Sequence, residues 1–206
     1  MLQNNKQLIV FIKAPQPGKC KTRLIPYMSA EQASEFYKEL VINCLDKATT
    51  LEHTDIAIYT YPDINHPYIK ALGERYPVSL KLQSGSDLGE RMHHAIQQSL
   101  QEYEKCILIG TDCPVLDTRY IDKAFKALDQ HDMVLGPAKD GGYVLIGATK
   151  IEPSLFNNIK WGTNTVLQQS LNNNEAAAYK THLLSTLWDI DTPEDYIKYQ
   201  SLPIID

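Results

Sequence analysis

Short apolar runs alternate with longer amphipathic segments along most of the chain. The runs are rich in Ile, Leu and Val, and they lie at residues 8–12, 56–60, 78–83 and 106–109. Between them, apolar residues recur at helical spacing over about 29–51, 65–74, 88–103 and 118–128. Continuous apolar runs are typical of parallel strands buried on both faces. The alternation predicts an α/β fold with a mostly parallel central sheet and helices on both of its faces.

Two of the helix starts carry capping signals. Ser29 and Gln32 form an S-x-x-Q capping box ahead of the first helix. Near the end of the chain, Thr192 and Pro193 supply an N-cap and a proline at the first helical position, and two acids follow in the first turn. These signals predict where the first and last helices begin.

The C-terminal half departs from the alternation. Only residues 136–142 separate the apolar segments 133–135 and 143–146, which is too short for a crossover helix. This spacing predicts an antiparallel or bent pair of strands. A helix follows from the W-G-T-N segment at Trp161 to about residue 171, where three asparagines are expected to break it.

A final strand is expected near residues 179–184. The sequence shows no repeat, no low-complexity segment and no clear linker, so a single domain is predicted over residues 1–206.

Composition and charge narrow the classes of function. The formal net charge of -5 argues against a general nucleic-acid binder or a membrane-surface protein. The longest early apolar run is far too short to span a bilayer. The four cysteines have no metal-type spacing and follow no recognisable signal peptide, so we expect reduced thiols in a cytoplasmic protein.

Asp112 stands where a predicted strand ends. The apolar run 106–109 stops at Gly110 and Thr111, which bring this carboxylate to the carboxyl end of the strand. Ligands of open α/β sheets bind outside the carboxyl ends of the strands, so Asp112 is a candidate metal ligand or catalytic carboxylate. The alternative is an aspartate that caps the following turn.

A basic loop follows the first predicted strand. Its four cations are Lys13, Lys19, Lys21 and Arg23. Lysine supplies point charges and arginine binds two oxygens at once, so phosphates are the expected ligands. The loop is neither a P-loop nor a G-x-G-x-x-G fingerprint, because Cys20 follows Gly18-Lys19 and the glycine spacing is wrong. The alternative is a solvated basic loop.

Asp189 and Asp191 form an acidic pair near the end of the chain. They alternate across Ile190, so extended backbone would turn both carboxylates to one side. A hard cation such as Mg²⁺ or Mn²⁺ takes a few carboxylates and completes its shell with water and substrate phosphates. Together with Asp112, the pair predicts a metal site. The alternative for Asp191 is support of the Thr192 cap.

Three polar loops are expected at the same rim. The first holds Gln83, Asp87 and Arg91. The second contains Asp140, Gly141 and Gly142, which form either a hairpin turn or a close approach to substrate. The third holds Trp161 and Thr163, which either shape an acceptor pocket or serve packing. Adjacent His93 and His94 point about 100° apart on a helix, so a metal pair is not expected there. Cys113 is interpreted as a buried thiol rather than a nucleophile.

The ordered motifs resemble a known family. They are K-A-P-x-P-G-x-x-K-T-R-L from Lys13, D-L-G-x-R-M from Asp87, G-T-D-C-P from Gly110, K-D-G-G-Y from Lys139, W-G-T from Trp161 and D-I-D-T-P-E-D from Asp189. The set resembles the bacterial GT-A-type glycosyltransferase family of the arsenosugar-biosynthesis type, within the nucleotide-diphospho-sugar transferase superfamily. That family is related to phospholactate guanylyltransferases and molybdenum-cofactor nucleotidyltransferases. The resemblance spans residues 8–196.

The resemblance implies the Rossmann-like fold of that superfamily and roles for the matching residues. The nucleotide phosphates would be held by Lys13, Lys19, Lys21 and Arg23. The nucleoside or substrate side would be lined by Gln83, Asp87 and Arg91. The divalent metal, Mg²⁺ or Mn²⁺, would be bound by Asp112, Asp189 and Asp191.

Three functional hypotheses follow. The first is a metal-dependent glycosyltransferase that uses a nucleotide sugar and a small-molecule acceptor, with Asp112 catalytic through the metal and Asp140 as base. Its acceptor loop would comprise Gly141, Gly142, Trp161 and Thr163. The second is nucleotidyl transfer from a nucleoside triphosphate to a phosphorylated small molecule. The third is a nucleotide-binding protein without catalysis. None of them involves nucleic acid or a membrane span, and all leave the oligomeric state open.

Overall fold

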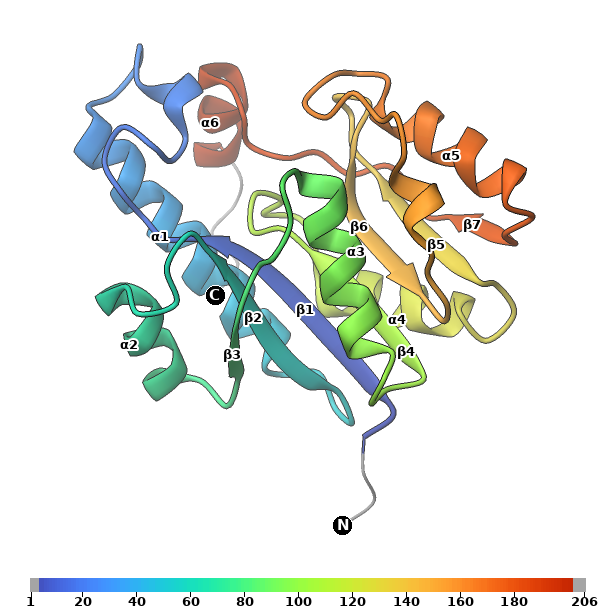
Figure 1. Ribbon diagram of the computed structural model, residues 1–206. Helices are drawn as coiled ribbons and strands as arrows, with labels where there is room; N and C mark the ends of the chain where they lie inside the picture. Colours follow the sequence, from blue (N-terminus) through green and yellow to red (C-terminus); the bar gives the residue numbers. More distant parts are fainter. Residues whose placement is uncertain (1–3, 202–206) are drawn as a thin grey trace.

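Seven strands form one sheet in the order β3-β2-β1-β4-β6-β5-β7 in the computed structural model, which describes residues 4–201 (Figure 1). The strands are β1 (Lys6–Lys13), β2 (Asp55–Tyr61), β3 (Ser79–Leu82), β4 (Lys105–Ile109), β5 (Met133–Pro137), β6 (Tyr143–Ala148) and β7 (Thr181–Leu183). β6 pairs antiparallel with both β4 and β5, and the other pairs among the described strands are parallel. The predicted sheet, with its antiparallel element in the C-terminal half, is confirmed. The first three and last five residues of the predicted domain lie outside the described residues.

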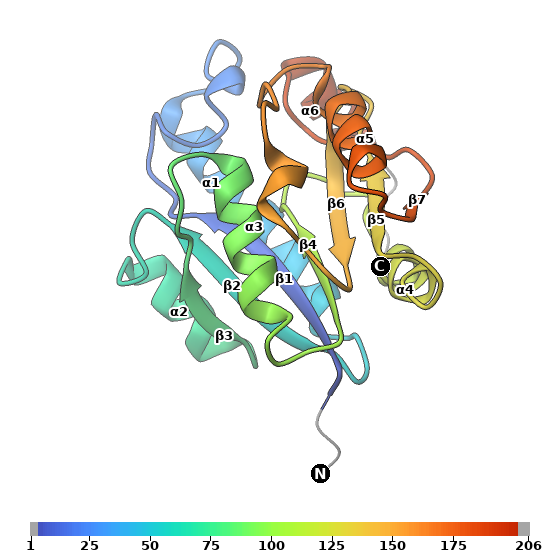
Figure 2. The same cartoon turned by 45° about the vertical axis from the view of Figure 1, so that its right-hand side comes forward.

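Helices cover both faces of the sheet, as predicted (Figure 2). One face carries α1 (Ala30–Ala48), α2 (Pro67–Arg75) and α4 (Thr118–Ala127), and the other carries α3 (Leu88–Ser99), α5 (Val166–Ala176) and the short 3₁₀ helix η2 (Pro153–Phe156). Successive side chains of a strand point to opposite faces. Accordingly, Leu8, Val10 and Ile12 pack with α1, whereas Ile9 packs with α3. The continuous apolar run of β1 therefore fills two cores.

The capping signals are confirmed at both helices. Ser29 and Gln32 exchange the two hydrogen bonds of a capping box at α1. At α6 (Pro193–Gln200), Thr192 and Asp195 form a second capping box. α6 packs with the N-terminal part of α1 and with the 3₁₀ helix η1 (Thr22–Leu24). This packing anchors the D-I-D segment beside the basic loop.

The predicted end of α5 at the three asparagines is wrong. The helix continues to Ala176, and the side chain of Asn173 donates to the carbonyls of Leu155 and Asn157. Asn174 is buried and donates to Thr181 Oγ1. Asparagine is a poor helix former because its side chain competes for local backbone groups. Here those amides bond to neighbouring elements instead, so tertiary contacts override the local preference. α1 and α3 also end before the predicted residues 51 and 103.

The strand order changes direction between β1 and β4, which lie side by side with Leu8 opposite Ile107. From β1 the chain passes through α1 to β2, and it returns from β3 through α3, on the opposite face, to β4. Such a switch point leaves a crevice at the carboxyl ends of the strands. Lys13 ends β1 and Gly110 follows β4, so the basic loop and Asp112 meet at this crevice. Among residues 4–201, no helix has the length and apolar character needed to cross a bilayer.

Candidate active site at the junction of β1 and β4

Two adjoining cavities of about 350 and 330 Å³ open at the junction. We call the first the basic chamber, because its lining includes Lys13, Lys19, Lys21, Arg23, Gln83 and Asp191. We call the second the acidic chamber, because its lining includes Asp140 and Asp189 beside Tyr143, Trp161 and Thr163. Among the described residues, four line both cavities: Phe11, Leu88, Gly110 and Asp112. Asp112 is therefore the charged group at which the chambers meet.

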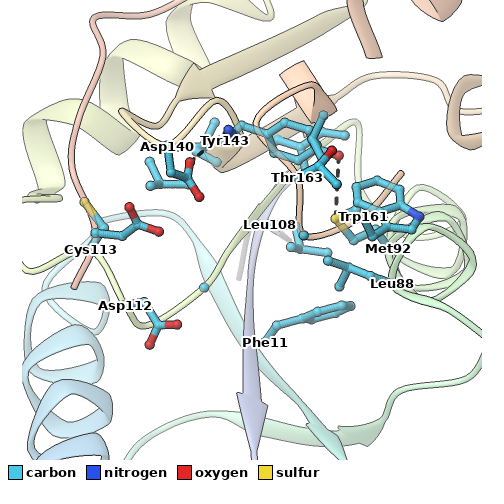
Figure 3. Close-up of a pocket in the computed structure, with 18 residues that line it drawn as sticks. Phe11, Leu88, Met92, Leu108, Asp112, Cys113, Asp140, Tyr143, Trp161 and Thr163 are labelled. Atoms are coloured by element: carbon cyan, nitrogen blue, oxygen red, sulfur yellow. Dashed lines mark hydrogen bonds between the residues drawn. The ribbon is translucent and has the colours of Figure 1, made fainter. Parts of the chain in front are cut away.

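The acidic chamber has two different walls (Figure 3). Asp112 and Asp140 lie on one side, and Phe11, Leu88 and Trp161 lie on the other. Sequence analysis missed Phe11 and Leu88. Phe11 belongs to the alternate set of β1 side chains near the carboxyl end of the strand, and Leu88 is a large apolar side chain that is 44% exposed at the start of α3.

Lys21 is not a solvated cation. Its side chain is only 4% exposed, and its Nζ lies 2.8 Å from Asp112 Oδ1. The same Nζ donates to the carbonyl of Ile190, and the amide of Ile190 donates to the carbonyl of Asp112. Lys21 also has a left-handed backbone conformation, with φ of 48°. These contacts join the basic loop, the end of β4 and the D-I-D segment.

A second ion pair links the same two segments at the surface. Arg23 Nη1 contacts Asp191 Oδ2. The alternative role for Asp191, support of the Thr192 cap, falls to Asp195, whose carboxylate accepts from both the amide and the hydroxyl of Thr192. Two of the predicted phosphate-binding cations are thus paired with two of the predicted metal-binding carboxylates.

Asp112 does not cap the next helix. Asp117 accepts from the amide of Tyr120 at the start of α4 and fills that role. Asp112 Oδ1 is buried, and no donor in residues 4–201 makes a well-directed hydrogen bond to it, although Lys21 lies within ion-pair distance. Among these residues, the partner of the oxygen is the Lys21 ammonium, which a metal ion could replace.

Asp189 lies in a field of negative charge. Burial, together with the carboxylates of Asp140, Asp191 and Asp112, raises the pKa of its carboxyl to about 6 against an opposing backbone hydrogen bond. Like charges disfavour the ionisation of a neighbouring carboxyl. Among the described residues that line this chamber, no Lys, Arg or His offsets these negative charges.

The three predicted metal ligands do not form a preformed coordination site. Asp189 lines the acidic chamber and Asp191 the adjoining basic one, so the two carboxylates lie in different chambers. Within the described part of the chain, no group of three His, Cys, Asp or Glu side chains is placed to hold a metal ion. Mg²⁺ needs only one or two carboxylates when water and phosphates complete its shell. The hard oxygen donors and the raised pKa of Asp189 fit that mode of binding.

The K-D-G-G turn is both a hairpin and part of the cavity wall. Asp140 Oδ1 accepts from the amide of Gly142, and Gly142 lines the acidic chamber. Gly141 has φ of +89°, and a Cβ atom there would lie 2.2 Å from the carbonyl oxygen of Asn164. The expected close approach at Gly141 is thus made by the chain's own W-G-T-N segment.

Asp87 and Arg91 lie outside the lining of both chambers. Asp87 caps α3 by accepting from the amide of Glu90. The Arg91 guanidinium stacks over Tyr61, 3.8 Å from the ring centroid, and donates to Gly85. Of that predicted group, Gln83 alone lines the basic chamber, where its amide nitrogen donates to the carbonyl of Tyr59.

His93 has a packing role, as the sequence predicts, whereas Cys113 is half-buried rather than buried. His93 is buried against Phe156, and burial lowers its pKa, with a further contribution from His94. Cys113 lines the acidic chamber, and burial raises the pKa of its thiol to about 12. A thiol with that pKa stays protonated at neutral pH, which does not suit a nucleophile.

Comparison with known proteins places the chain in a family. The model of the DUF2064 family, described as an uncharacterized protein conserved in bacteria, matches residues 44–163. The chain belongs to the DUF2064 family. A solved structure from Desulfovibrio desulfuricans G20, described as a candidate nucleotide-diphospho-sugar transferase, superposes with a TM-score of 0.89 at 31% identity, over 98% of this chain and 89% of that one.

Curated relatives of this DUF2064 protein are guanylyltransferases. The 2-phospho-L-lactate guanylyltransferases of Methanocaldococcus sp. FS406-22 and Methanocaldococcus jannaschii are 27% and 26% identical to it, over 90% of this chain and 78% and 79% of theirs. The 4-diphosphocytidyl-2C-methyl-D-erythritol synthase of Anaerococcus prevotii shares the fold, with a TM-score of 0.64 at 12% identity, over 96% of this chain and all of that one. These findings confirm the predicted superfamily and the transferase class.

Proposed function

We propose that this DUF2064 protein is a metal-dependent glycosyltransferase that uses a nucleotide-diphospho-sugar as donor and a small hydroxylated molecule as acceptor. The observation that carries the proposal is the meeting of two chambers of opposite charge at Asp112. The cations of the basic chamber suit the donor diphosphate. The sugar and the acceptor would then lie beyond Asp112, in the acidic chamber.

The lining of the acidic chamber favours uncharged, hydroxylated ligands. Its described residues include the carboxylates of Asp112, Asp140 and Asp189, and they include no Lys, Arg or His. Carboxylates accept hydrogen bonds from hydroxyl groups, and the opposite wall offers apolar surface to a sugar ring. A phosphorylated or carboxylated acceptor would be repelled by all three acids before a metal ion binds, and still by Asp140 once Asp112 and Asp189 hold the metal. This charge pattern supports sugar transfer over transfer to a phosphorylated acid.

Each residue then has a chemical role. Asp112, with Asp189 or Asp191, would hold Mg²⁺ or Mn²⁺, which when bound supplies charge neutralisation to the diphosphate. Lys19 and Arg23 stabilise the negative charge that develops as the bond between the anomeric carbon and the diphosphate oxygen breaks. The acceptor oxygen forms the new bond to that carbon, and Asp140 takes its proton.

Nucleotidyl transfer is the second candidate. It is favoured by the relatives named 2-phospho-L-lactate guanylyltransferase, which align with 90% of this chain. In that reaction the same four cations would hold a nucleoside triphosphate, and pyrophosphate would leave. The two candidates therefore share the basic chamber and differ in the occupant of the acidic one.

A donor screen tests the proposal. Nucleotides and nucleotide sugars are added with and without Mn²⁺, and thermal unfolding is followed, because a ligand that binds the native state raises its stability. The preferred donors are then incubated with neutral polyols and with phosphorylated acids. Release of a nucleoside diphosphate supports sugar transfer, and release of pyrophosphate supports nucleotidyl transfer. Metal-dependent stabilisation without turnover of any donor would support a non-catalytic nucleotide-binding protein.

A further inference from the structure

Two ion pairs lie within the basic chamber and engage two of its four cations. Lys21 Nζ lies 2.8 Å from Asp112 Oδ1, and Arg23 contacts Asp191. All four residues line the basic chamber. Two of the four cations suited to a phosphate are thus paired with carboxylates suited to a metal ion, whereas Lys13 and Lys19 form no ion pair within residues 4–201.

This arrangement makes the binding of a metal ion alone, or of a diphosphate alone, less favourable. A metal ion at Asp112 would take the carboxylate from Lys21, whose side chain is 4% exposed and would be left without a counter-ion. A free diphosphate at Lys21 and Arg23 would displace the carboxylates of Asp112 and Asp191 and then face both of them unpaired. When metal and diphosphate arrive together, every displaced group finds a partner of opposite charge.

We infer that the site binds the metal–diphosphate complex as one ligand, by exchanging its two internal ion pairs for contacts with that complex, and that it discriminates against free metal and free diphosphate. The inference rests on the proposed function, because it takes the donor diphosphate to occupy the basic chamber.

The surroundings allow this exchange without a change of fold. The backbone bond from Ile190 to Asp112 and the bond from Lys21 Nζ to Ile190 hold the segments together independently of the ion pair. The Asp112 side chain is 45% exposed and that of Arg23 is 63% exposed, so both have room to turn. Only side chains have to move.

The exchange is tested by measuring the binding of each ligand alone, because breaking an ion pair by substitution should strengthen the binding of one of the two ligands. Removal of a phosphate-binding cation should strengthen binding of metal alone, and removal of a metal-binding carboxylate should strengthen binding of diphosphate alone. On the full chain, Mn²⁺ alone is followed by the electron paramagnetic resonance of free Mn²⁺, and pyrophosphate alone by calorimetry in EDTA. R23Q should bind Mn²⁺, and D191N should bind pyrophosphate, about fivefold more tightly than the wild type, the equivalent of one exposed ion pair. K21M and D112N test the more buried pair in the same way, with effects at least as large.

Matched controls separate the exchange from a general change in charge. K19M removes a cation from the basic chamber, and D140N removes a carboxylate from the acidic chamber. Neither residue forms an ion pair within residues 4–201. K19M should therefore change Mn²⁺ affinity, and D140N pyrophosphate affinity, by less than about twofold.

The outcomes are distinct. The inference is supported if R23Q gains more affinity for Mn²⁺ than K19M does, and if D191N gains more affinity for pyrophosphate than D140N does. It is overturned if the affinities of R23Q and D191N change no more than those of these controls. Both substitutions lie at the surface and leave the buried Lys21 contact intact. Failure of the premise that a diphosphate occupies the basic chamber is recognised differently, because the wild type would then bind neither ligand even when Mn²⁺ and pyrophosphate are supplied together. Failure of glycosyl transfer itself is recognised by the released phosphate in the donor screen.

Discussion

A Cβ atom on Gly89 would lie 2.7 Å from Cζ2 of Trp161. The glycine of the D-L-G-x-R-M motif is therefore the surface against which the tryptophan of the W-G-T motif packs. Trp161 also meets Tyr143 edge-on, with ring centroids 6.5 Å apart. Two motifs that lie far apart in the sequence thus fix the apolar wall of the acidic chamber.

Substitution of Gly89→Ala should destabilise the protein although alanine favours helix. Alanine gains about 1 kcal/mol over glycine in a helix interior, and Gly89 lies in the first turn of α3, where the gain is smaller. The clash with a rigid indole costs about 1–3 kcal/mol, so the free energy of unfolding should fall. Urea unfolding measures this change. Gly73→Ala in α2 is the matched control, because its new Cβ meets the flexible end of Leu80 at 2.8 Å and that end can rotate away. Equal effects of the two substitutions would contradict the packing role of Trp161.

Substitution of Gly141→Ala should cost more than substitution of Gly162→Ala. Both glycines have positive φ, but a Cβ on Gly141 meets the Asn164 backbone at 2.2 Å, whereas a Cβ on Gly162 meets nothing within 4 Å. The left-handed conformation costs about 1–2 kcal/mol for either residue. The clash should add about 2 kcal/mol or more at Gly141. Thermal and urea unfolding give the comparison, and similar losses would mean that the two turns do not pack as described.

Substitution of Asp195→Asn should weaken the α6 cap in a pH-dependent way. Burial opposes ionisation of this carboxyl, but hydrogen bonds from the Thr192 hydroxyl and from the amides of Thr192 and Asp191 lower its pKa. A carboxyl with a lowered pKa stabilises the fold above its unfolded-state value, near 4, and this stabilisation is lost as the pH falls through the folded value. The substitution should cost about 1 kcal/mol at pH 7. Urea unfolding at pH 7 and pH 3 should show the difference between wild type and variant shrinking at the lower pH, and a constant difference would contradict this role.

Substitution of Asp112→Asn should lower turnover by about 10²-fold or more, because the charge that would hold the metal is lost at the point where the chambers meet. The fold should persist, since the backbone bond from Ile190 to Asp112 does not involve the carboxylate. Steady-state turnover and the circular dichroism of the variant provide the two measurements. Wild-type turnover in a folded variant would exclude the proposed role.

Much of the fold was predictable because its signals are local. The apolar runs, the capping boxes at Ser29 and Thr192, and the short 136–142 connection each depend on neighbouring residues. The sheet could therefore be predicted with its antiparallel strand. The end of α5 could not, because Asn174 is held by contacts with Thr181 that only the tertiary structure provides.

The site was predictable as a location and less so as a set of partners. Strand ends identified Asp112 and the basic loop, and the switch point between β1 and β4 brings them together. The pairing of Lys21 with Asp112 could not be predicted, because charge alone suggests a phosphate for one and a metal for the other. The same applies to Asp87 and Arg91, whose capping and stacking depend on α3 and on Tyr61. The cytoplasmic location and the absence of a nucleic-acid partner stay predictions.

The identity of the leaving group tests the central claim most directly. The donor selected by thermal stabilisation is incubated with the protein, Mn²⁺ and a neutral polyol, and the released phosphates are identified by phosphorus NMR, with Asp112→Asn as the inactive control. We expect a nucleoside diphosphate and a glycosylated polyol, both absent with the variant. Release of pyrophosphate from a nucleoside triphosphate, with a phosphorylated acid as the acceptor, would contradict it.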